Sequence, residues 1–112
     1  MEELLKDIRQ FNEERDWGQF HTPKNLAMSL AIEVAEVMEH FQWLTQEEGN
    51  NLSIDKKREI SEELGDVMIY LVNLADKLNI DLLKAAQMKI EKNRRRYPIT
   101  KAKGNSNKYL EL

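Results

Sequence analysis

The chain contains no cysteine, which excludes disulfide bonds and thiol catalysis. Glycine and proline are scarce, with 4 and 2 residues among 112, and this favours helices over a β-rich or disordered chain. No run approaches the roughly 18 consecutive apolar residues of a membrane span. The first residues, MEELLKDIRQF, lack the apolar centre of a secretory signal. We therefore expect an ordinary soluble, all-α, cytoplasmic protein.

Positive charge is not in excess either, because 17 Lys and Arg stand against 20 Asp and Glu and give a net charge of −3. Such a balance does not indicate a surface for nucleic acid or for a membrane, and we expect neither as a partner. The length fits one domain, which we place at residues 1–98, followed by a polar tail at 99–112. Slender helices bury only a thin core, so we expect the chain to pack against further copies of itself.

The spacing of apolar residues predicts four main helices. Their expected bounds are 2–15, about 23–44 after the capping pair Thr22 and Pro23, a third from a cap at Ser53 or Asp55 to Leu78, and a fourth between the cap Asp81 and Pro98. The polar run TQEEGNNLSID before the third helix predicts a turn or a flexible loop. The tail ITKAKGNSNKYLEL predicts an extended or mobile segment.

Two acidic pairs stand out, Glu33-x-x-Glu36 in the second predicted helix and Glu63-x-x-Asp66 in the third. On ideal helices the two members of each pair lie about 55–60° and about 115–120° from the centre of the apolar stripe, in the same rotational sense. Antiparallel packing through the stripes would make the four carboxylates converge. Such a group repels itself unless a cation neutralises it, and its oxygens suit Mg²⁺ or Mn²⁺. A single acidic pair more often consists of ordinary solvated charges on the flank of a helix. Two pairs that match in spacing and flank favour a metal site.

The connector RDWGQFHTP is rich in aromatic side chains. Trp17 and Phe20 are either core anchors or, together with His21, the wall of a pocket for a flat ring. Trp43 lies off the apolar stripe of its helix and therefore needs another partner, either a neighbouring subunit or a ligand. Tyr70, one turn after the second acidic pair, is either a half-buried helix tyrosine or a hydrogen-bonding contact to a ligand or a metal-bound water.

The fourth predicted helix carries polar groups on the face that holds its small alanines. Lys89 and Asn93 lie on that face and Arg96 extends it. A lysine and an arginine beside a metal–carboxylate site are suited to a polyphosphate. The alternative is a solvated basic helix end, including Arg94 and Arg95, that complements the helix dipole.

Taken together, these segments resemble the MazG-like, all-α nucleotide pyrophosphohydrolases, in particular their small dCTP pyrophosphatase branch. The resemblance runs through RDWGQFHTPKNL, EVAEVMEHFQW, EELGDVMIYL and KNRRRYP, so it covers most of the chain apart from the first helix and the tail. It implies a four- to five-helix bundle that assembles as a homodimer or homotetramer, with sites built between subunits. It also implies Mg²⁺-dependent cleavage of a (deoxy)nucleoside triphosphate between the α and β phosphates, which gives a monophosphate and pyrophosphate.

The resemblance also assigns roles to individual residues. The implied metal ligands are Glu33, Glu36, Glu63 and Asp66. One of these carboxylates is expected to act as general base, and our candidates are Glu36 and Glu63. The implied substrate contacts are Trp17, His21 and Trp43 to the base, Tyr70 near the sugar or the phosphates, and Lys89, Asn93 and Arg96 to the phosphates.

Other interpretations stay open at this point. Carboxylate-bridged di-iron or di-manganese bundles place Glu-x-x-His on two helices, whereas Glu36 and His40 are four residues apart here. A non-catalytic helical interaction module would explain the amphipathic helices but not the matched acidic flanks. The related phosphoribosyl-ATP pyrophosphohydrolases share the chemistry, but the aromatic segments RDWGQF and FQW favour a free nucleotide with a stacked base.

Overall fold

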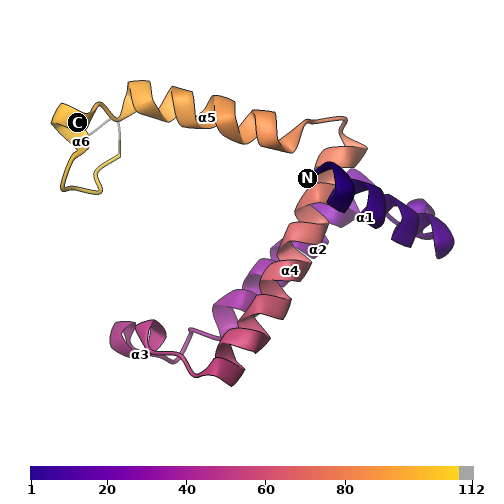
Figure 1. Cartoon of the computed structure of the whole chain (residues 1–112), viewed down its shortest axis with the longest axis horizontal. Helices are drawn as coiled ribbons and strands as arrows, with labels where there is room; N and C mark the ends of the chain where they lie inside the picture. The colour runs from indigo at the N-terminus through magenta and orange to yellow at the C-terminus, as the bar shows by residue number, and fades with distance from the viewer. Residues whose placement is uncertain (109–112) are drawn as a thin grey trace. The chain divides into compact units, whose positions relative to one another are not determined.

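The computed structural model describes residues 1–108, and that part of the chain contains helices and turns but no strand (Figure 1). The helices are α1 (Glu2–Glu14), the short 3₁₀ helix η1 (Trp17–Gln19), α2 (Pro23–Glu39), α3 (Gln46–Asn50), α4 (Ile54–Lys77), α5 (Leu82–Arg96) and α6 (Ile99–Ala102). The predicted all-α class is therefore confirmed. Within the described part, no helix combines the length and apolar character needed to cross a membrane.

The chain divides into two compact units. The first is Met1–Ile80 and the second begins at Asp81. α2 and α4 form the centre of the first unit, where they run antiparallel and side by side (Figure 1). The pair buries Leu26, which is 1% exposed, and the α4 residues Ile60, Val72 and Ala75. Apolar residues three and four positions apart form these buried stripes, so the antiparallel packing follows the sequence pattern.

Side-chain caps determine where three of the helices begin. The side-chain oxygens of Thr22, Ser53 and Asp81 each accept a hydrogen bond from the backbone N–H three residues further along. A cap of this kind typically stabilises a helix by about 1 kcal/mol. Of the two caps predicted for α4, Ser53 is the one that forms.

The predicted end of the second helix was wrong. α2 ends at Glu39 rather than at Leu44, because the backbone N–H groups of His40 and Phe41 bond to carbonyl oxygens three residues back instead of four. Such bonds tighten the last turn and stop the helix. As a result, Trp43 lies in a turn and not on a helix.

Two predictions for irregular segments were also wrong. The polar run after α2 contains the helix α3, which starts at a capping box formed by Thr45 and Glu48; the spacing of these two residues is the sequence signal for such a box. In the expected tail, residues 99–102 form the single helical turn α6 after Pro98. Residues 109–112 of that tail lie outside the described residues.

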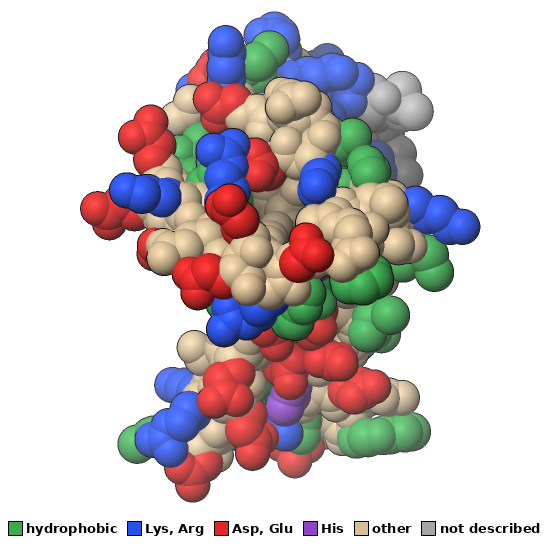
Figure 2. All heavy atoms as spheres, turned by 90° about the vertical axis from the view of Figure 1, so that its right-hand side faces the viewer, with side chains coloured by type: hydrophobic (Ala, Val, Ile, Leu, Met, Phe, Trp, Pro, Cys, Tyr) green, Lys and Arg blue, Asp and Glu red, His purple; other side chains and the backbone are tan. Residues whose placement is uncertain are grey.

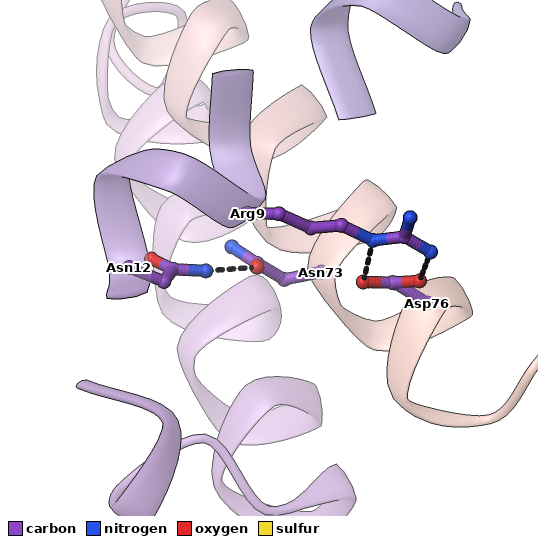
Figure 3. Close-up of polar contacts among 4 residues, drawn as sticks. All are labelled: Arg9, Asn12, Asn73 and Asp76. Atoms are coloured by element: carbon purple, nitrogen blue, oxygen red, sulfur yellow. Dashed lines mark hydrogen bonds and ion pairs between the residues drawn. The ribbon is translucent and has the colours of Figure 1, made fainter. Parts of the chain in front are cut away.

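Two polar contacts connect α1 to α4 (Figure 3). Arg9 binds both carboxylate oxygens of Asp76, through Nε at 3.0 Å and Nη2 at 2.5 Å. The Nδ2 group of Asn12 donates a hydrogen bond to Oδ1 of Asn73 at 2.7 Å. The hydrogen bond from Arg9 holds the pKa of Asp76 below its usual range. Asn73 is 6% exposed, and no other polar side chain is as deeply buried among residues 1–108.

Asp76→Asn is expected to lower the free energy of unfolding by only about 0.2–1 kcal/mol, because the Arg9 partner is largely exposed and the pair is screened by solvent. Urea denaturation at pH 7 measures this loss, and the loss should shrink in 1 M salt. A loss several times larger, or one that salt does not reduce, would contradict this assignment of the pair.

Candidate active site

α2 and α4 bring three glutamates together. Glu33 and Glu36 come from α2 and Glu63 comes from α4, and one carboxylate oxygen of each lies within 4.8 Å of the other two. The spacing of three residues places Glu33 and Glu36 on one flank of α2, and the antiparallel packing sets Glu63 beside them. All three side chains are half-buried. Acidic side chains gather around a histidine in the lower half of Figure 2.

Crowding and burial disfavour the ionised forms of these carboxyls. Burial raises the pKa of Glu33 to about 7, and a hydrogen bond with Glu36 and repulsion from Glu36, Asp66 and Glu63 act in the same direction. The pKa of Glu63 is raised chiefly by its hydrogen bond with Glu36, then by burial and by repulsion, while His40 opposes the shift. The site therefore holds more negative charge than it can stabilise alone.

Two oxygens of the cluster lack partners. Oε2 of Glu33 and Oε2 of Glu63 are buried and make no hydrogen bond within the described part of the chain. Buried oxygens without a partner are uncommon, and carboxylate oxygens are the ligands that Mg²⁺ and Mn²⁺ prefer. The three glutamates therefore fit a divalent cation, which would engage these oxygens and neutralise the cluster.

Asp66, the fourth predicted ligand, lies one turn beyond Glu63 and is exposed. Its charge acts on both Glu33 and Glu63, but its side chain is not part of the three-glutamate cluster and lines a neighbouring cleft. Its role as a ligand stays a prediction.

The sequence reasoning missed His40 as a neighbour of the cluster. Its ring nitrogens lie 4.0 Å from a carboxylate oxygen of Glu59 and 3.9 Å from one of Glu63. The available signal was the spacing of four residues from Glu36, which puts His40 one helical turn further along the same flank.

A cleft of about 370 Å³ lies beside Asp66, lined by residues of α1, η1 and α4 and by His21. Three of the predicted substrate contacts line it, namely Trp17, His21 and Tyr70. Trp17 packs edge to face against Phe11 at 5.4 Å and against His21 at 6.2 Å between ring centroids. Of the two alternatives for Trp17, the structure favours the pocket wall over the core anchor. The volume lies within the range of small-molecule sites.

His21 contributes a polar edge to this cleft. Burial lowers its pKa, and the charge of Lys77 lowers it further, so the ring is neutral at pH 7 and offers one donor and one acceptor. Its Nδ1 atom is buried and has no hydrogen-bond partner among residues 1–108.

Of the remaining predicted contacts, Trp43 belongs to the first unit and does not line the cleft. Trp43 is 86% exposed, which agrees with its expected need for another partner. Lys89, Asn93 and Arg96 lie on α5 in the second unit, where Lys89 is exposed and the other two are half-buried. The contacts of these three residues with the substrate phosphates stay predictions.

The fold and the site define an all-α protein with an acidic cluster between two antiparallel helices and an aromatic cleft beside it. The chain belongs to the MazG-like family, whose sequence profile matches residues 28–112. It is 46% identical to dCTP pyrophosphatase 1 of Homo sapiens and 44% identical to that of Bos taurus, each over 99% of this chain and 69% of the relative.

A solved structure agrees with this assignment. The crystal structure of a pyrophosphatase from Archaeoglobus fulgidus matches with a TM-score of 0.83 and 47% sequence identity, over 88% of this chain and 92% of that one. The family resemblance inferred from the sequence is confirmed.

Proposed function

We propose that this protein hydrolyses dCTP, or a related or modified deoxynucleoside triphosphate, to the monophosphate and pyrophosphate in a reaction that requires Mg²⁺. The observation that carries the proposal is the cluster of Glu33, Glu36 and Glu63, whose unpartnered oxygens lie beside an aromatic cleft. Its relatives named dCTP pyrophosphatase 1 support the choice of substrate. The expected cytoplasmic location suits an enzyme that acts on the nucleotide pool.

The carboxylates would serve both to bind the metal and to accept a proton. Glu33, Glu36 and Glu63 would hold the metal, with Asp66 as a further ligand. The bound metal supplies positive charge for the phosphates and lowers the pKa of water. Either Glu36 or Glu63 would accept the proton of the attacking water.

The substrate would lie with its base in the cleft and its phosphates towards the carboxylates. Trp17 and His21 would contact the base, and Tyr70 would contact the sugar or the phosphates, since all three line the cleft. Lys89, Asn93 and Arg96 would neutralise phosphate charge that the metal leaves uncompensated.

We also propose a homodimer or homotetramer. α2 and α4 expose large apolar side chains that a second copy would bury. Those at least half exposed on these two helices are Met28, Ile32, Val34, Met38, Ile54 and Leu64. Trp43 could then reach the base from a neighbouring subunit.

A panel of the common nucleoside and deoxynucleoside triphosphates tests the proposed reaction, with products resolved by phosphorus NMR. With Mg²⁺ we expect monophosphate and pyrophosphate, fastest for dCTP, and with EDTA no turnover. Release of inorganic phosphate instead would place the cleavage at another bond. If no triphosphate is hydrolysed, the non-catalytic interaction module becomes the better interpretation.

Trp43→Ala is expected to weaken nucleotide binding about 10- to 100-fold, because stacking of a base on an aromatic ring is worth roughly 1–3 kcal/mol. The affinity for Mg²⁺ should not change. Calorimetric titration with a non-hydrolysable dCTP analogue measures the effect. An unchanged nucleotide affinity would remove Trp43 from the binding site.

A further inference from the structure

The wall of the cleft contains one polar feature that the assigned roles do not use. Asn12 of α1 and Asn73 of α4 both line the cleft, beside aromatic and aliphatic side chains. Their amide groups face each other (Figure 3) and are joined by the 2.7 Å hydrogen bond from Nδ2 of Asn12 to Oδ1 of Asn73. The cleft therefore has a pair of amides in its wall as well as rings.

The pair is not needed to attach α1 to α4. Arg9 and Asp76 already join the two helices, and neither of them lines the cleft. Two apolar side chains in place of a hydrogen-bonded polar pair can leave stability nearly unchanged or raise it, whereas a buried amide must keep its partner. Packing alone therefore does not explain an amide as deeply buried as that of Asn73.

The pair has unused hydrogen-bonding capacity. Each amide offers two N–H donors and an oxygen that can accept two bonds, and the contact between them uses one donor of Asn12 and one acceptor site of Asn73. Nδ2 of Asn73 and Oδ1 of Asn12 make no hydrogen bond within residues 1–108, yet neither is sealed from solvent. A ligand in the cleft meets a free donor beside a free acceptor.

We propose that the Asn12–Asn73 pair determines base specificity by binding the hydrogen-bonding edge of the nucleobase; this inference rests on the proposed function. The N3 atom of cytosine accepts a hydrogen bond and its 4-amino group donates one. Nδ2 of Asn73 complements the first and Oδ1 of Asn12 complements the second. Uracil presents the reverse order, an N3–H and a 4-carbonyl. Its N3–H would therefore face the Nδ2 donor of Asn73, and its 4-carbonyl would face the Oδ1 acceptor of Asn12.

The comparison of dCTP with dUTP isolates this contact, since the two substrates differ only along that edge. The quantity to measure is the ratio of kcat/KM for dCTP to kcat/KM for dUTP. Asn73→Leu keeps the branched outline of the side chain and removes the donor, and Asn12→Ala removes the acceptor at a half-buried position. Each variant removes one of the two bonds and is expected to lower the ratio by about 3- to 10-fold, since losing a whole two-bond contact to a base edge usually costs about 10- to 100-fold.

Asp76→Asn is the matched control, because it weakens the other contact between α1 and α4 and leaves the cleft intact. It should keep the ratio of the unmodified protein. An unchanged ratio in folded Asn73→Leu and Asn12→Ala, with both substrates still hydrolysed, would overturn the inference and leave the proposed function standing. If the unmodified protein hydrolyses neither substrate, the proposed function fails and this inference fails with it.

Discussion

Glu63→Gln is expected to lower kcat for dCTP on the order of 10²–10⁴-fold, the range typical for loss of a catalytic acid or base. Glutamine has nearly the shape of glutamate but carries no charge, so it binds a divalent cation weakly and cannot serve as a base at neutral pH. In metal-free protein the same change removes the electrostatic repulsion between Glu63 and Glu36. The melting temperature in EDTA should therefore stay constant or rise.

Glu62→Gln is the control for this variant, since Glu62 is the preceding residue of α4 and is exposed. It should change neither kcat nor the melting temperature. Steady-state kinetics with Mg²⁺ and thermal melting by circular dichroism in EDTA separate the two effects. Loss of helical signal in Glu63→Gln would identify Glu63 as a structural residue, and an unchanged kcat would exclude it from the site.

Mg²⁺ is expected to raise the melting temperature, and to raise it more at pH 8 than at pH 5. The pKa of Glu33 is about 7 in the folded chain, whereas its ordinary value is 4.5. Between these two pH values the folded protein therefore keeps a proton that the unfolded chain has released. This contribution to stability is fully present below about pH 4.5 and is lost as the pH rises through about 7. Above that pH the ionised cluster repels itself until a cation neutralises it.

Mg²⁺ at a hundred times its dissociation constant adds about 2.7 kcal/mol, which corresponds to an increase on the order of 10 °C for a domain of this size. Thermal melts from pH 5 to pH 8, with EDTA or with Mg²⁺ at equal ionic strength, measure both effects. Glu33→Gln should flatten the pH dependence in EDTA and reduce the increase with Mg²⁺. Identical profiles for Glu33→Gln and the unmodified protein would contradict this account of the cluster.

The parts of the fold and site that repeat along a helix could be predicted from the sequence. Apolar residues every three or four positions define the buried faces of α2 and α4, and the same helical geometry fixes the flank on which each glutamate lies. The proximity of the Glu33, Glu36 and Glu63 carboxylates could therefore be predicted from their spacing along the helices together with antiparallel packing. Trp17 and His21 were predicted from the aromatic connector as well as from the resemblance, and both line the cleft.

Other parts depend on contacts that spacing does not encode. The end of α2 depends on which carbonyl oxygens the next backbone N–H groups bond to. α3 is different, because the spacing of Thr45 and Glu48 does signal its capping box, and the polar composition of the segment obscured that signal. The Asn12–Asn73 and Arg9–Asp76 pairs join residues 61 and 67 positions apart, so they become visible only once α1 is placed against α4. The proposed contact of Lys89 with the substrate likewise depends on tertiary placement rather than on helical periodicity.

The proposed activity depends on a metal held by Glu33, Glu36 and Glu63. The most direct test of this metal site is titration of the protein with Mn²⁺, followed by electron paramagnetic resonance of the free ion, in the unmodified chain and in the three Glu→Gln variants. We expect saturable binding that weakens at least about 10-fold in each variant, the smallest loss usual for changes around a metal site, and stays unchanged in Glu62→Gln. Equal Mn²⁺ affinity in all of these proteins would contradict this assignment of the metal ligands.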